Sequence, residues 1–596
     1  MTTYEAPVRD MKFLLQDVLQ IGKYSNLPGF SDASEDVLDA ILEEGAKIAR
    51  DVVHPLNTVG DKQGCVRNDD ASVTTPKGFN EAYQQLVEGG WMGLTSDPDY
   101  GGQGLPNIVG MAWSEMLSSA NQAFAMYPGL THGAYAALHH HGTEEQKKKY
   151  LPKMVSGEWG GTMNLTEPHC GTDLGMLKSK AVPVGDGSYK ISGQKIWISG
   201  GEHDMAENIV HLVLARIEGA PEGVKGISLF VAPKYFVNDD GSLGDRNGVS
   251  CGGLEEKMGI HGNSTCVMNY DEATGWLVGE ENKGLKAMFV MMNEARIGTG
   301  MQGLGQASVA YQNCVPFAKD RIQGRSLTGP KNPDGPADPI IVHPDVRRML
   351  MNQKAFVEGG RAFTFWMSLY TDLLTKSPDE EVRQKASDYL ALLTPVLKAF
   401  LTDRGFKSCI EAQQVLGGSG FTQEWGIEQF VRDCRISMIY EGTNGVQALD
   451  LVGRKLMAEG GRYWQTYFKE IDEFVAENEG DADMAPFVAG LKSAKAQLEE
   501  ATGWLGENAM KNFDHAGAGS TDYLQMFGLT TLAYMWAMMV KVSLGKIADG
   551  DSDPLYANKI KTGRYYVDRV LPEIAAHFAK LKTGADPVMA LEEEAF

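Results

Sequence analysis

Four short segments of this 596-residue chain contain residue types that can do chemistry. Glu441, in the loop-like stretch Tyr440–Asn444 (YEGTN), is a carboxylate of the kind that serves as a general base. The other three segments combine hydroxyl, small and aromatic residues that could bring hydrogen-bonding groups close to a ligand. Each segment alone has an ordinary interpretation as a turn, a strand, a helix C-cap or a loop, so their order along the chain carries the information. These three segments are Met163–Asp173 (MNLTEPHCGTD), Ile196–Gly201 (IWISGG) and Gln414–Phe421 (QVLGGSGF).

The glycines of Gly298–Gly303 (GTGMQG) match the spacing of a dinucleotide-binding fingerprint. That mechanism needs a strand before the glycines and a helix whose N-terminus faces a pyrophosphate. The preceding run LKAMFVMMNEARI has helical texture, and no strand–loop–helix unit surrounds it. We therefore predict that these small residues let helices pack closely rather than bind a nucleotide.

A run of three histidines, His139–His141, raises the question of a metal site. Adjacent residues of a helix cannot converge on one ion, and no carboxylate lies at ligand spacing from them. Gly142 follows directly, so we expect the histidines at a helix end and predict no metal. The seven cysteines are scattered and never spaced as CxxC, which indicates reduced thiols in a cytoplasmic protein.

The composition indicates a globular protein of several domains, with 43% hydrophobic and 22% charged residues. A formal charge of -23 supplies no basic footprint, so we predict no nucleic-acid partner. The N-terminus lacks the continuous apolar region of a secretion signal. The most apolar stretch, Leu532–Val540, is nine residues long, so we expect a buried helix and no membrane attachment.

Changes in sequence texture predict the order of the elements. Helical periodicity dominates the first part, for example between Asp32 and His54. Short β-rich runs such as YKISGQKIWISG, IVHLVLARI and GISLFVAP follow, and long helical patterns then return around a proline- and glycine-rich insertion, Thr328–Ile341. We expect a mainly α fold with a central β sandwich or barrel. Its predicted parts are an N-terminal helical domain (1–160), a β domain (161–283), a helical bundle (284–456) and a C-terminal helical extension (457–596).

Taken in order, the chemistry-bearing segments resemble the signatures of the acyl-CoA dehydrogenase family, from about Gly60 to Leu456. Thr166–Asp173 resembles the family's flavin-binding TEP segment with its GSD continuation, and Ile196–Gly201 resembles its WITNGG strand. The length, the insertion and the C-terminal extension are similar to those of a long bacterial subgroup. Further matches are Pro98–Gly104 (PDYGGQG), Gly142–Pro152 (GTEEQKKKYLP), and Arg296 with Arg321, twenty-five residues apart.

The resemblance implies a noncovalent FAD between the β domain and the helices that follow it. An isoalloxazine ring needs hydrogen-bonding groups at its polar edge and a flat apolar wall beside it. Main-chain groups of Met163–Thr166 and the Thr166 hydroxyl would bond the polar edge of the ring. Trp197 with Ile198 would form the flat wall, with the Ser199 hydroxyl near the ring. The full set implied on this side is Met163, Leu165, Thr166, Gly171, Thr172, Trp197, Ile198 and Ser199.

By the same resemblance, the rest of the FAD site crosses a subunit interface, which implies a homodimer or homotetramer. The sequence departs from the family pattern at two places: Gln323-Gly324 replaces the family's usual polar–Phe pair, and Gly445 replaces a frequent glutamine. Adenine-side packing would then differ, and one FAD contact would be lost. The neighbouring subunit would supply Arg321, Gln323, Gln414 and Gly418, and Thr443 would come from the subunit that carries the base.

The implied reaction is the α,β-dehydrogenation of an acyl-CoA thioester to a trans-2-enoyl-CoA. A thioester α-hydrogen is a very weak acid, so its removal needs a positioned base and stabilisation of the enolate-like oxygen. Glu441 matches the family's catalytic glutamate, and desolvation by a bound acyl chain would make it a stronger base. Its main-chain N–H would hold the thioester oxygen together with a hydroxyl of FAD. The implied substrate contacts are Asn293, Arg296, Tyr440 and Gly442.

The sequence leaves the acyl group and the electron acceptor open. Similarity to the subgroup favours 3-(methylthio)propanoyl-CoA, with other short or medium acyl-CoAs as alternatives, and electron transfer to an electron-transfer flavoprotein. An acyl-CoA oxidase would share the fold and the glutamate but return electrons to oxygen. A DNA-associated flavoprotein of the same fold would need a basic surface, and a helical scaffold without catalysis would bind no FAD. Nothing in the sequence assigns a role to the C-terminal extension.

Overall fold

The computed structural model describes residues 2–596, apart from the side chain of Val290, and its elements fall into two units. Unit 1 contains the residues up to Glu43, Pro106–Glu115 and Thr299–Phe596, and unit 2 contains Glu44–Leu105 and Met116–Gly298. The chain passes between the units within α2 (Glu35–Ile48), just before and again within α5 (Asn107–Ala120), and within α8 (Gly284–Asp320). The four-part division expected from sequence texture follows chain order instead, and its boundaries remain a prediction.

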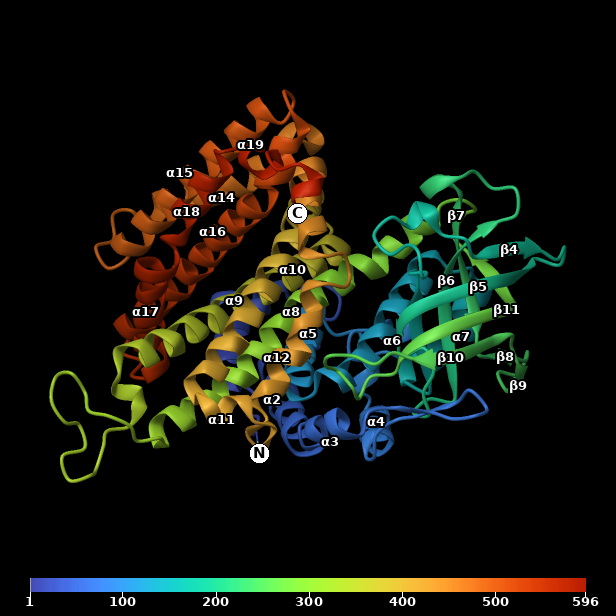
Figure 1. The fold of residues 1–596 in the computed structure, drawn as a ribbon, viewed down its shortest axis with the longest axis horizontal. Helices are drawn as coiled ribbons and strands as arrows, with labels where there is room; N and C mark the ends of the chain where they lie inside the picture. Colours follow the sequence, from blue (N-terminus) through green and yellow to red (C-terminus); the bar gives the residue numbers. More distant parts are fainter. Residues whose placement is uncertain (1) are drawn as a thin grey trace. The chain divides into compact units, whose positions relative to one another are not determined.

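The β module of unit 2 is a sheet of seven strands, within the residues described, that closes on itself (Figure 1). β11 pairs with β5, β5 with β4, β4 with β6, β6 with β7, and β7 returns to β11. β10 adds to β11, and β3 adds to β6 in parallel. The strands are β3 (Trp159–Asn164), β4 (Lys180–Pro183), β5 (Ser188–Ser199), β6 (Asn208–Ile217), β7 (Ile227–Pro233), β10 (Val249–Leu254) and β11 (Thr265–Val278).

The three β-rich runs expected from the sequence form β5, β6 and β7. Nearly every residue of β6 and β7 is buried, as expected for continuous apolar runs covered on both faces. The β module is therefore confirmed, and its closed pairing favours a barrel over a sandwich. Two small ribbons lie outside it: β1 (Val66–Arg67) pairs with β2 (Val73–Thr74), and β8 (Tyr235–Val237) with β9 (Leu243–Arg246).

Helices of unit 2 pack against this module. α6 (Gln122–His141) lies against β3 and ends at the three histidines, which confirms them as helix-end residues. The His139 ring nitrogen Nε2 lies 2.9 Å from the Asp97 carboxylate. Thr143 is the N-cap of α7 (Glu144–Ser156) and forms a reciprocal capping box with Gln146. The other helices here are α3 (Pro55–Gln63) and α4 (Phe79–Glu88).

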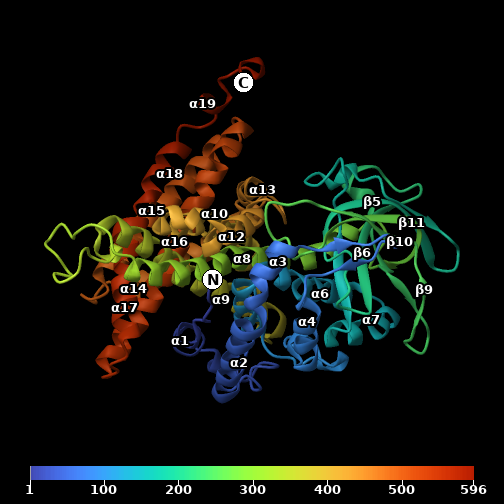
Figure 2. The same ribbon diagram turned by 60° about the horizontal axis from the view of Figure 1, so that its bottom comes forward.

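Long helices packed side by side make up unit 1 (Figure 2). α9 (Pro344–Lys376) packs against α10 (Glu380–Leu416), and Asp379 caps α10 by accepting the Glu381 N–H at 2.8 Å. The remaining helices are α1 (Val8–Lys12), α11 (Gly418–Phe421), α12 (Ile427–Arg435), α13 (Asn444–Asp450), α14 (Arg462–Asn478), α15 (Ala485–Asn508), α16 (Phe513–Ala548), α17 (Pro554–Tyr565), α18 (Glu573–Leu581) and α19 (Asp586–Met589).

Two glycines of the GTGMQG stretch lie where α8 packs on α10. A Cβ added at Gly300 would meet the Leu397 side chain at 2.3 Å, and one added at Gly303 would lie 2.8 Å from the Leu401 carbonyl oxygen. Gly298 has open space instead. The helical interpretation of this segment is confirmed, and close helix packing explains the second and third glycines.

The C-terminal extension is built into unit 1 through α16. By length and composition this helix could cross a membrane, with a mean hydropathy of 1.3 in its most apolar window, but 78% of that window is buried inside the protein. The Trp536 indole N–H donates to the Ala355 carbonyl of α9 at 3.1 Å. The expected burial of Leu532–Val540 is confirmed at every position except the half-buried Met538.

The insertion Thr328–Ile341 is irregular up to its last two residues, as expected, and is organised by one buried carboxylate. Asp338 accepts hydrogen bonds from the backbone amides of Ser326, Lys331 and Asn332 at 2.7–2.9 Å. These bonds lower the pKa of Asp338 to about 2. One side chain therefore determines the course of the loop that follows α8.

Candidate active site

The expected TEP segment leaves β3 as a loop, Leu165–Thr172, hereafter the Thr166 loop. Two hydrogen bonds join it to β5: the Ile196 N–H donates to the Thr166 carbonyl at 3.0 Å, and the Lys195 ammonium donates to the Leu165 carbonyl at 3.0 Å. They bring the Thr166 loop and the Ile196–Ser199 strand side by side, thirty residues apart in sequence. Both segments expected to hold the flavin thus share one place in unit 2.

A buried ion pair underlies the Thr166 loop. The Lys195 ammonium lies 2.8 Å from the Glu167 carboxylate, and the two side chains are 0% and 3% exposed. Glu167 also accepts the backbone N–H groups of Lys178 and Ser179 at 2.7 and 3.0 Å. Burial alone would raise the pKa of the Glu167 carboxyl, but Lys195 and these hydrogen bonds hold the pKa below its usual value. The conformation of the loop is therefore set by a paired charge.

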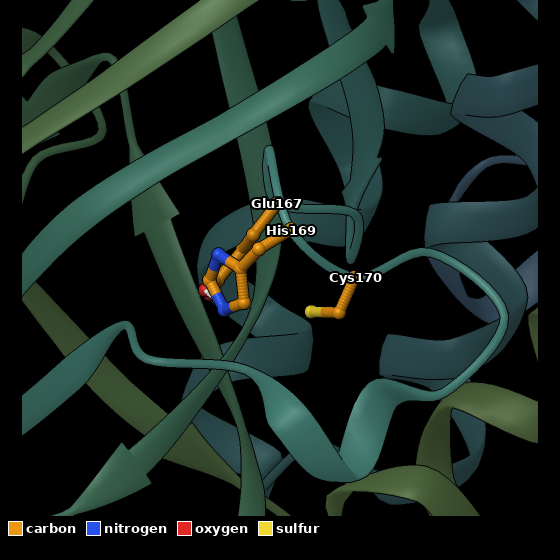
Figure 3. A group of neighbouring side chains, drawn as sticks. All are labelled: Glu167, His169 and Cys170. Atoms are coloured by element: carbon orange, nitrogen blue, oxygen red, sulfur yellow. Dashed lines mark ion pairs between the residues drawn. The ribbon is translucent and has the colours of Figure 1, made fainter.

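Glu167, His169 and Cys170 offer ligand atoms that lie within 4.8 Å of one another (Figure 3). The Glu167 carboxylate and the His169 ring already have protein partners. The Glu167 carboxylate is bound as described above, and the His169 ring nitrogen Nε2 lies 2.9 Å from the Met176 carbonyl. Glu167 and Cys170 also exchange backbone hydrogen bonds, at 2.9 and 3.1 Å. This cluster thus closes the turn that carries Gly171 and Thr172.

Trp197 presents an aromatic surface beside the Thr166 loop. Its side chain is 61% exposed although it is large and apolar, and its φ is +59°. A left-handed backbone costs a non-glycine residue on the order of 1–3 kcal/mol, so the surroundings must impose it. Ile198 is buried behind it. A Cβ added at Gly171 would meet the Thr166 side chain only at 3.4 Å, so the backbone there is approachable. The flat face and open backbone suit an aromatic cofactor.

The other expected residues of unit 2 lie on β5, β3 and α8. Ser199 ends β5 and Met163 lies on β3, and both are half-buried. Asn293 is exposed on α8, and Arg296 follows within one turn, half-buried. The Arg296 guanidinium lies 6.0 Å from the centroid of the Phe289 ring. The roles expected for these residues remain predictions.

The expected base lies in unit 1, in the stretch Tyr440–Asn444, hereafter the Glu441 loop. Glu441 is half-buried with φ +57°, and Gly442 follows with φ +84°. A Cβ added at Gly442 would lie 2.5 Å from Gln447 Nε2, so glycine is required there for both conformation and space. Thr443 is exposed and accepts the Val446 N–H at 3.3 Å as the N-cap of α13.

Side chains on both sides hold the Glu441 loop. The Tyr440 hydroxyl donates to Gln302 of α8, and burial raises the pKa of Tyr440 above its ordinary value. Gln447 Nε2 donates to the Glu441 carbonyl at 3.2 Å. The Lys398 ammonium of α10, fully buried, donates to the Gly442 carbonyl at 2.8 Å. The carbonyls of Glu441 and of the residue after it are therefore both held from outside the loop.

The FAD contacts expected from a second subunit are exposed in this chain. Arg321 and Gln323 open the loop after α8, where the Gln323 N–H donates to the Asp338 carbonyl at 2.9 Å. Gln414 lies in the last turn of α10, and Gly418 begins α11. Gly417 between them has φ +58°, which confirms the expected helix C-cap.

Sequence reasoning missed Lys195 and Lys398, the buried lysines that donate to the Thr166 and Glu441 loops, and left Asn444 without a role. The signal was present: Lys195 lies in a β-rich run, and Lys398 interrupts the apolar helical stretch TPVLKAF. A lysine on a buried face is rare unless a partner meets it. The positive φ values of Trp197 and Glu441 had no such signal, because neither residue type favours that conformation.

Four family models match the chain and cover most of its length. They are the acyl-CoA dehydrogenase N-terminal domain at residues 48–158, the middle domain at 162–273, the C-terminal domain at 282–457, and an acetyl-CoA dehydrogenase C-terminal-like domain at 467–592. The matches thus include the β module, the Glu441 loop and most of the C-terminal extension.

Full-length relatives share these features. The chain is 40% identical over 588 residues to 3-methylmercaptopropionyl-CoA dehydrogenase of Ruegeria pomeroyi, covering 98% of this chain and 99% of the relative. It is 34% identical over 618 residues to a butyryl-CoA dehydrogenase of Syntrophomonas wolfei, covering 100% and 99% of the two chains. It is also 34% identical over 616 residues to the broad-specificity linear acyl-CoA dehydrogenase FadE5 of Mycobacterium tuberculosis, covering 100% of both chains.

Solved structures of the same fold include an FAD complex. An acyl-CoA dehydrogenase of Bacillus anthracis complexed with FAD covers 94% of this chain and 90% of its own, with a TM-score of 0.75 and 23% identity. An electron transferring flavoprotein structure of Acidaminococcus fermentans covers 72% of this chain and 99% of its own, with a TM-score of 0.58 and 25% identity. The chain belongs to the acyl-CoA dehydrogenase family and is an FAD-dependent oxidoreductase that acts on acyl-CoA thioesters.

Proposed function

We propose that this enzyme dehydrogenates 3-(methylthio)propanoyl-CoA, or another short or medium acyl-CoA, with Glu441 as the base that removes the α-proton. The first substrate is supported by 40% identity to the Ruegeria enzyme over nearly the whole of both chains. The relatives at 34% identity are named for butyryl-CoA and for linear acyl-CoAs in general, which supports straight chains as the alternative.

The role of Glu441 is supported above all by its backbone. A glutamate in the left-handed region, followed by a left-handed glycine, is an expensive conformation that the structure holds with two carbonyl contacts. Strain of this kind is concentrated at sites where one side chain must point in one direction. The half-buried carboxylate is both reachable and partly removed from water, which suits a base.

The residues of the chain would divide the reaction between them. The Glu441 carboxylate takes the proton as the α C–H bond breaks, and its main-chain N–H stabilises the negative charge on the thioester oxygen. Bound FAD supplies the acceptor for the hydride that leaves the β-carbon. The Thr166 loop and Trp197 would orient the flavin, and the Arg296 guanidinium suits a phosphate of CoA. The product is the trans-2-enoyl-CoA.

The test is an anaerobic titration of the FAD-loaded enzyme with a panel of acyl-CoAs, observed as bleaching of the flavin absorbance band. Glu441→Gln should keep FAD and slow flavin reduction by about 10²–10⁴-fold. Reduction by butanoyl- or octanoyl-CoA together with no reduction by 3-(methylthio)propanoyl-CoA would overturn the narrower substrate. Wild-type rates in the Glu441→Gln variant would overturn the base.

The electron acceptor, the assembly and the compartment belong to the same proposal. We expect an electron-transfer flavoprotein to reoxidise the reduced enzyme faster than oxygen does, and likeness to the Acidaminococcus structure supports this.

The exposure of Arg321, Gln323 and Gln414 supports a homodimer or homotetramer in which a second copy covers them. Seven free cysteines support a reducing, cytoplasmic location. Light scattering measures the assembly, and faster reoxidation by air would favour an oxidase.

A further inference from the structure

The Glu441 loop depends on contacts that come from a different helix. The loop has two successive left-handed residues, Glu441 and Gly442, and a chain segment in that conformation persists only where its surroundings determine it. Holding the carbonyl oxygens of both residues restricts the peptide planes on either side of Gly442. The first of these planes is bonded directly to the Glu441 Cα, and the second limits how the first can turn, so together they restrict the direction of the Glu441 side chain. Groups that bind the two carbonyls therefore control where the carboxylate points.

Lys398 of α10 supplies the charged contact. Its ammonium is fully buried and donates to the Gly442 carbonyl at 2.8 Å and to Asn444 Oδ1 at 2.9 Å. A hydrogen bond from a charged donor in a buried site is stronger than one between neutral groups, and its geometry is correspondingly specific. One ammonium thus connects the residue after the base with the first residue of α13.

Asn444 carries the connection further. Its side-chain nitrogen donates to Asp403 Oδ1 at 2.7 Å and to Thr402 Oγ1 at 3.0 Å, both on α10. Burial raises the pKa of the Asp403 carboxyl, and Asn444 and Lys398 oppose that rise. The second carboxylate oxygen, Oδ2, accepts Gln525 Nε2 at 2.9 Å. Gln525 belongs to α16 of the C-terminal extension, and α13 packs against the same helix.

We propose that Lys398 is a positioning residue for the catalytic base, and that the C-terminal extension takes part in this support through Gln525 and Asp403. The inference rests on the proposed role of Glu441. Lys398 acts through the Glu441 loop and touches neither substrate nor cofactor in this account. The extension, whose role the sequence left open, then serves the chemistry of the loop as well as the core of unit 1.

Lys398→Met tests the first part, because methionine matches the unbranched aliphatic part of lysine and lacks the ammonium. We expect flavin reduction to slow by up to about 10²-fold, the effect of misplacing a reacting group by about 1 Å. Substrate affinity and FAD content should remain those of the wild type. The matched control is Lys559→Met: Lys559 is another buried lysine of unit 1, paired with Asp10 and Glu358, and its loss should lower the unfolding temperature without slowing flavin reduction.

The decisive measurement is a double-mutant cycle with Glu441→Gln. If Lys398 acts only through the base, Lys398→Met will cause no further slowing once the carboxylate is gone. An equal slowing in both backgrounds, or none in the wild-type background, would overturn the positioning role. Wild-type rates in Glu441→Gln alone would instead overturn the proposed function, so the two failures are distinguishable.

Gln525→Leu tests the extension with a milder change. It removes one hydrogen bond to Asp403 and leaves Lys398 in place, and we expect a smaller slowing of flavin reduction that again disappears in the Glu441→Gln background. Ser543→Ala is the control, because Ser543 is buried on the same helix and its hydroxyl donates to Met539 of that helix. A Gln525→Leu enzyme with the rate of the Ser543→Ala enzyme would remove the extension from the proposal.

Discussion

The Thr166 loop of unit 2 and the Glu441 loop of unit 1 are held by the same device with different partners. In each, a fully buried lysine donates to a loop carbonyl, Lys195 to Leu165 and Lys398 to Gly442. The charge of Lys195 is met by the buried carboxylate of Glu167, which belongs to the loop itself. Lys398 donates to a backbone carbonyl and an amide oxygen, and its charge also helps to hold down the pKa of the nearby Asp403 carboxyl. We interpret the Lys195–Glu167 ion pair as fixing the position of the Thr166 loop. The Lys398 ammonium would instead orient Glu441 through the carbonyl of the next residue.

The largest expected difference between the two regions is the effect of acid on their stability. Burial, with smaller effects of nearby positive charges such as Lys234, lowers the pKa of His203 and of His211 to about 3. Above about pH 6.5 both rings are neutral in the folded and the unfolded chain. As the pH falls from about 6.5 to 3, the unfolded chain takes up protons that the folded chain refuses, so unit 2 loses stability. Asp403 beside the Glu441 loop has a raised pKa, and its protonation in acid opposes unfolding.

Hydrogen exchange followed by mass spectrometry tests this difference. Between pH 7 and about 4.5, peptides of 159–213 should lose protection, and peptides of 398–447 should keep it, after correction for the intrinsic exchange rate. His203→Phe should reduce the loss, because it removes one of the buried rings that stay neutral in the folded chain. Equal loss of protection in both regions would contradict the assignment.

Replacing Lys195 should lower the free energy of unfolding more than replacing Lys398 does. Lys195→Met leaves the Glu167 carboxylate buried without its counter-ion, and we expect a loss of about 3–5 kcal/mol in urea unfolding. Lys190→Met, on the exposed face of the same strand, should change stability by less than about 0.5 kcal/mol. A Lys398→Met protein that is the less stable of the two buried-lysine variants would break the comparison.

Replacing a glycine by alanine should impair the Glu441 loop more than the Thr166 loop. Gly442→Ala adds a methyl group 2.5 Å from Gln447 Nε2 in a left-handed backbone, whereas the methyl group of Gly171→Ala lies 3.4 Å from its nearest neighbour. We expect Gly442→Ala to lose about 1–3 kcal/mol and to slow flavin reduction with FAD still bound. Gly171→Ala should fold normally. Stopped-flow absorbance measures flavin reduction in the two variants, and thermal unfolding measures their stability. A Gly442→Ala enzyme with wild-type stability and wild-type flavin reduction would contradict a strained Glu441 loop.

Trp197→Ala should have the smallest effect on stability. The side chain is 61% exposed, so its removal should change the unfolding free energy of the apoprotein by less than about 0.5 kcal/mol. Retention of FAD on gel filtration should fall, because the flat wall is lost. Full retention of FAD by this variant would show that Trp197 does not support the flavin.

The periodicity of the chain was enough to predict its elements, but not their ends. The helix expected between Asp32 and His54 begins at Glu35, and its last turn, Ala49–Val53, is π-helical. The β-rich runs form β5, β6 and β7: β6 and β7 are continuous apolar runs buried in the sheet, whereas β5 has both buried and exposed residues. Closure into a barrel was left open, since it depends on pairing between strands far apart in sequence.

The candidate site was predictable where residue type determines the role, and not where backbone geometry does. The motifs located Glu441 and the Thr166 loop, because a carboxylate and a TEP turn are recognisable from sequence. The left-handed conformations of Glu441 and Trp197 were not foreseeable, because tertiary contacts impose them against local preference. Lys398 was missed for the same reason: its partner lies on a loop that is distant in sequence.

The burial of α16 has a consequence for the engineering of shorter variants. Gly528 lies directly against the Phe400 ring of α10, and the Trp536 indole N–H donates to α9, so the C-terminal extension and the helices before it share one hydrophobic interior. Cutting the gene after Lys455 to imitate the size of smaller relatives would expose apolar faces of α9 and α10 and promote aggregation. A minimal enzyme of this type would need those faces redesigned as a solvent-compatible surface first.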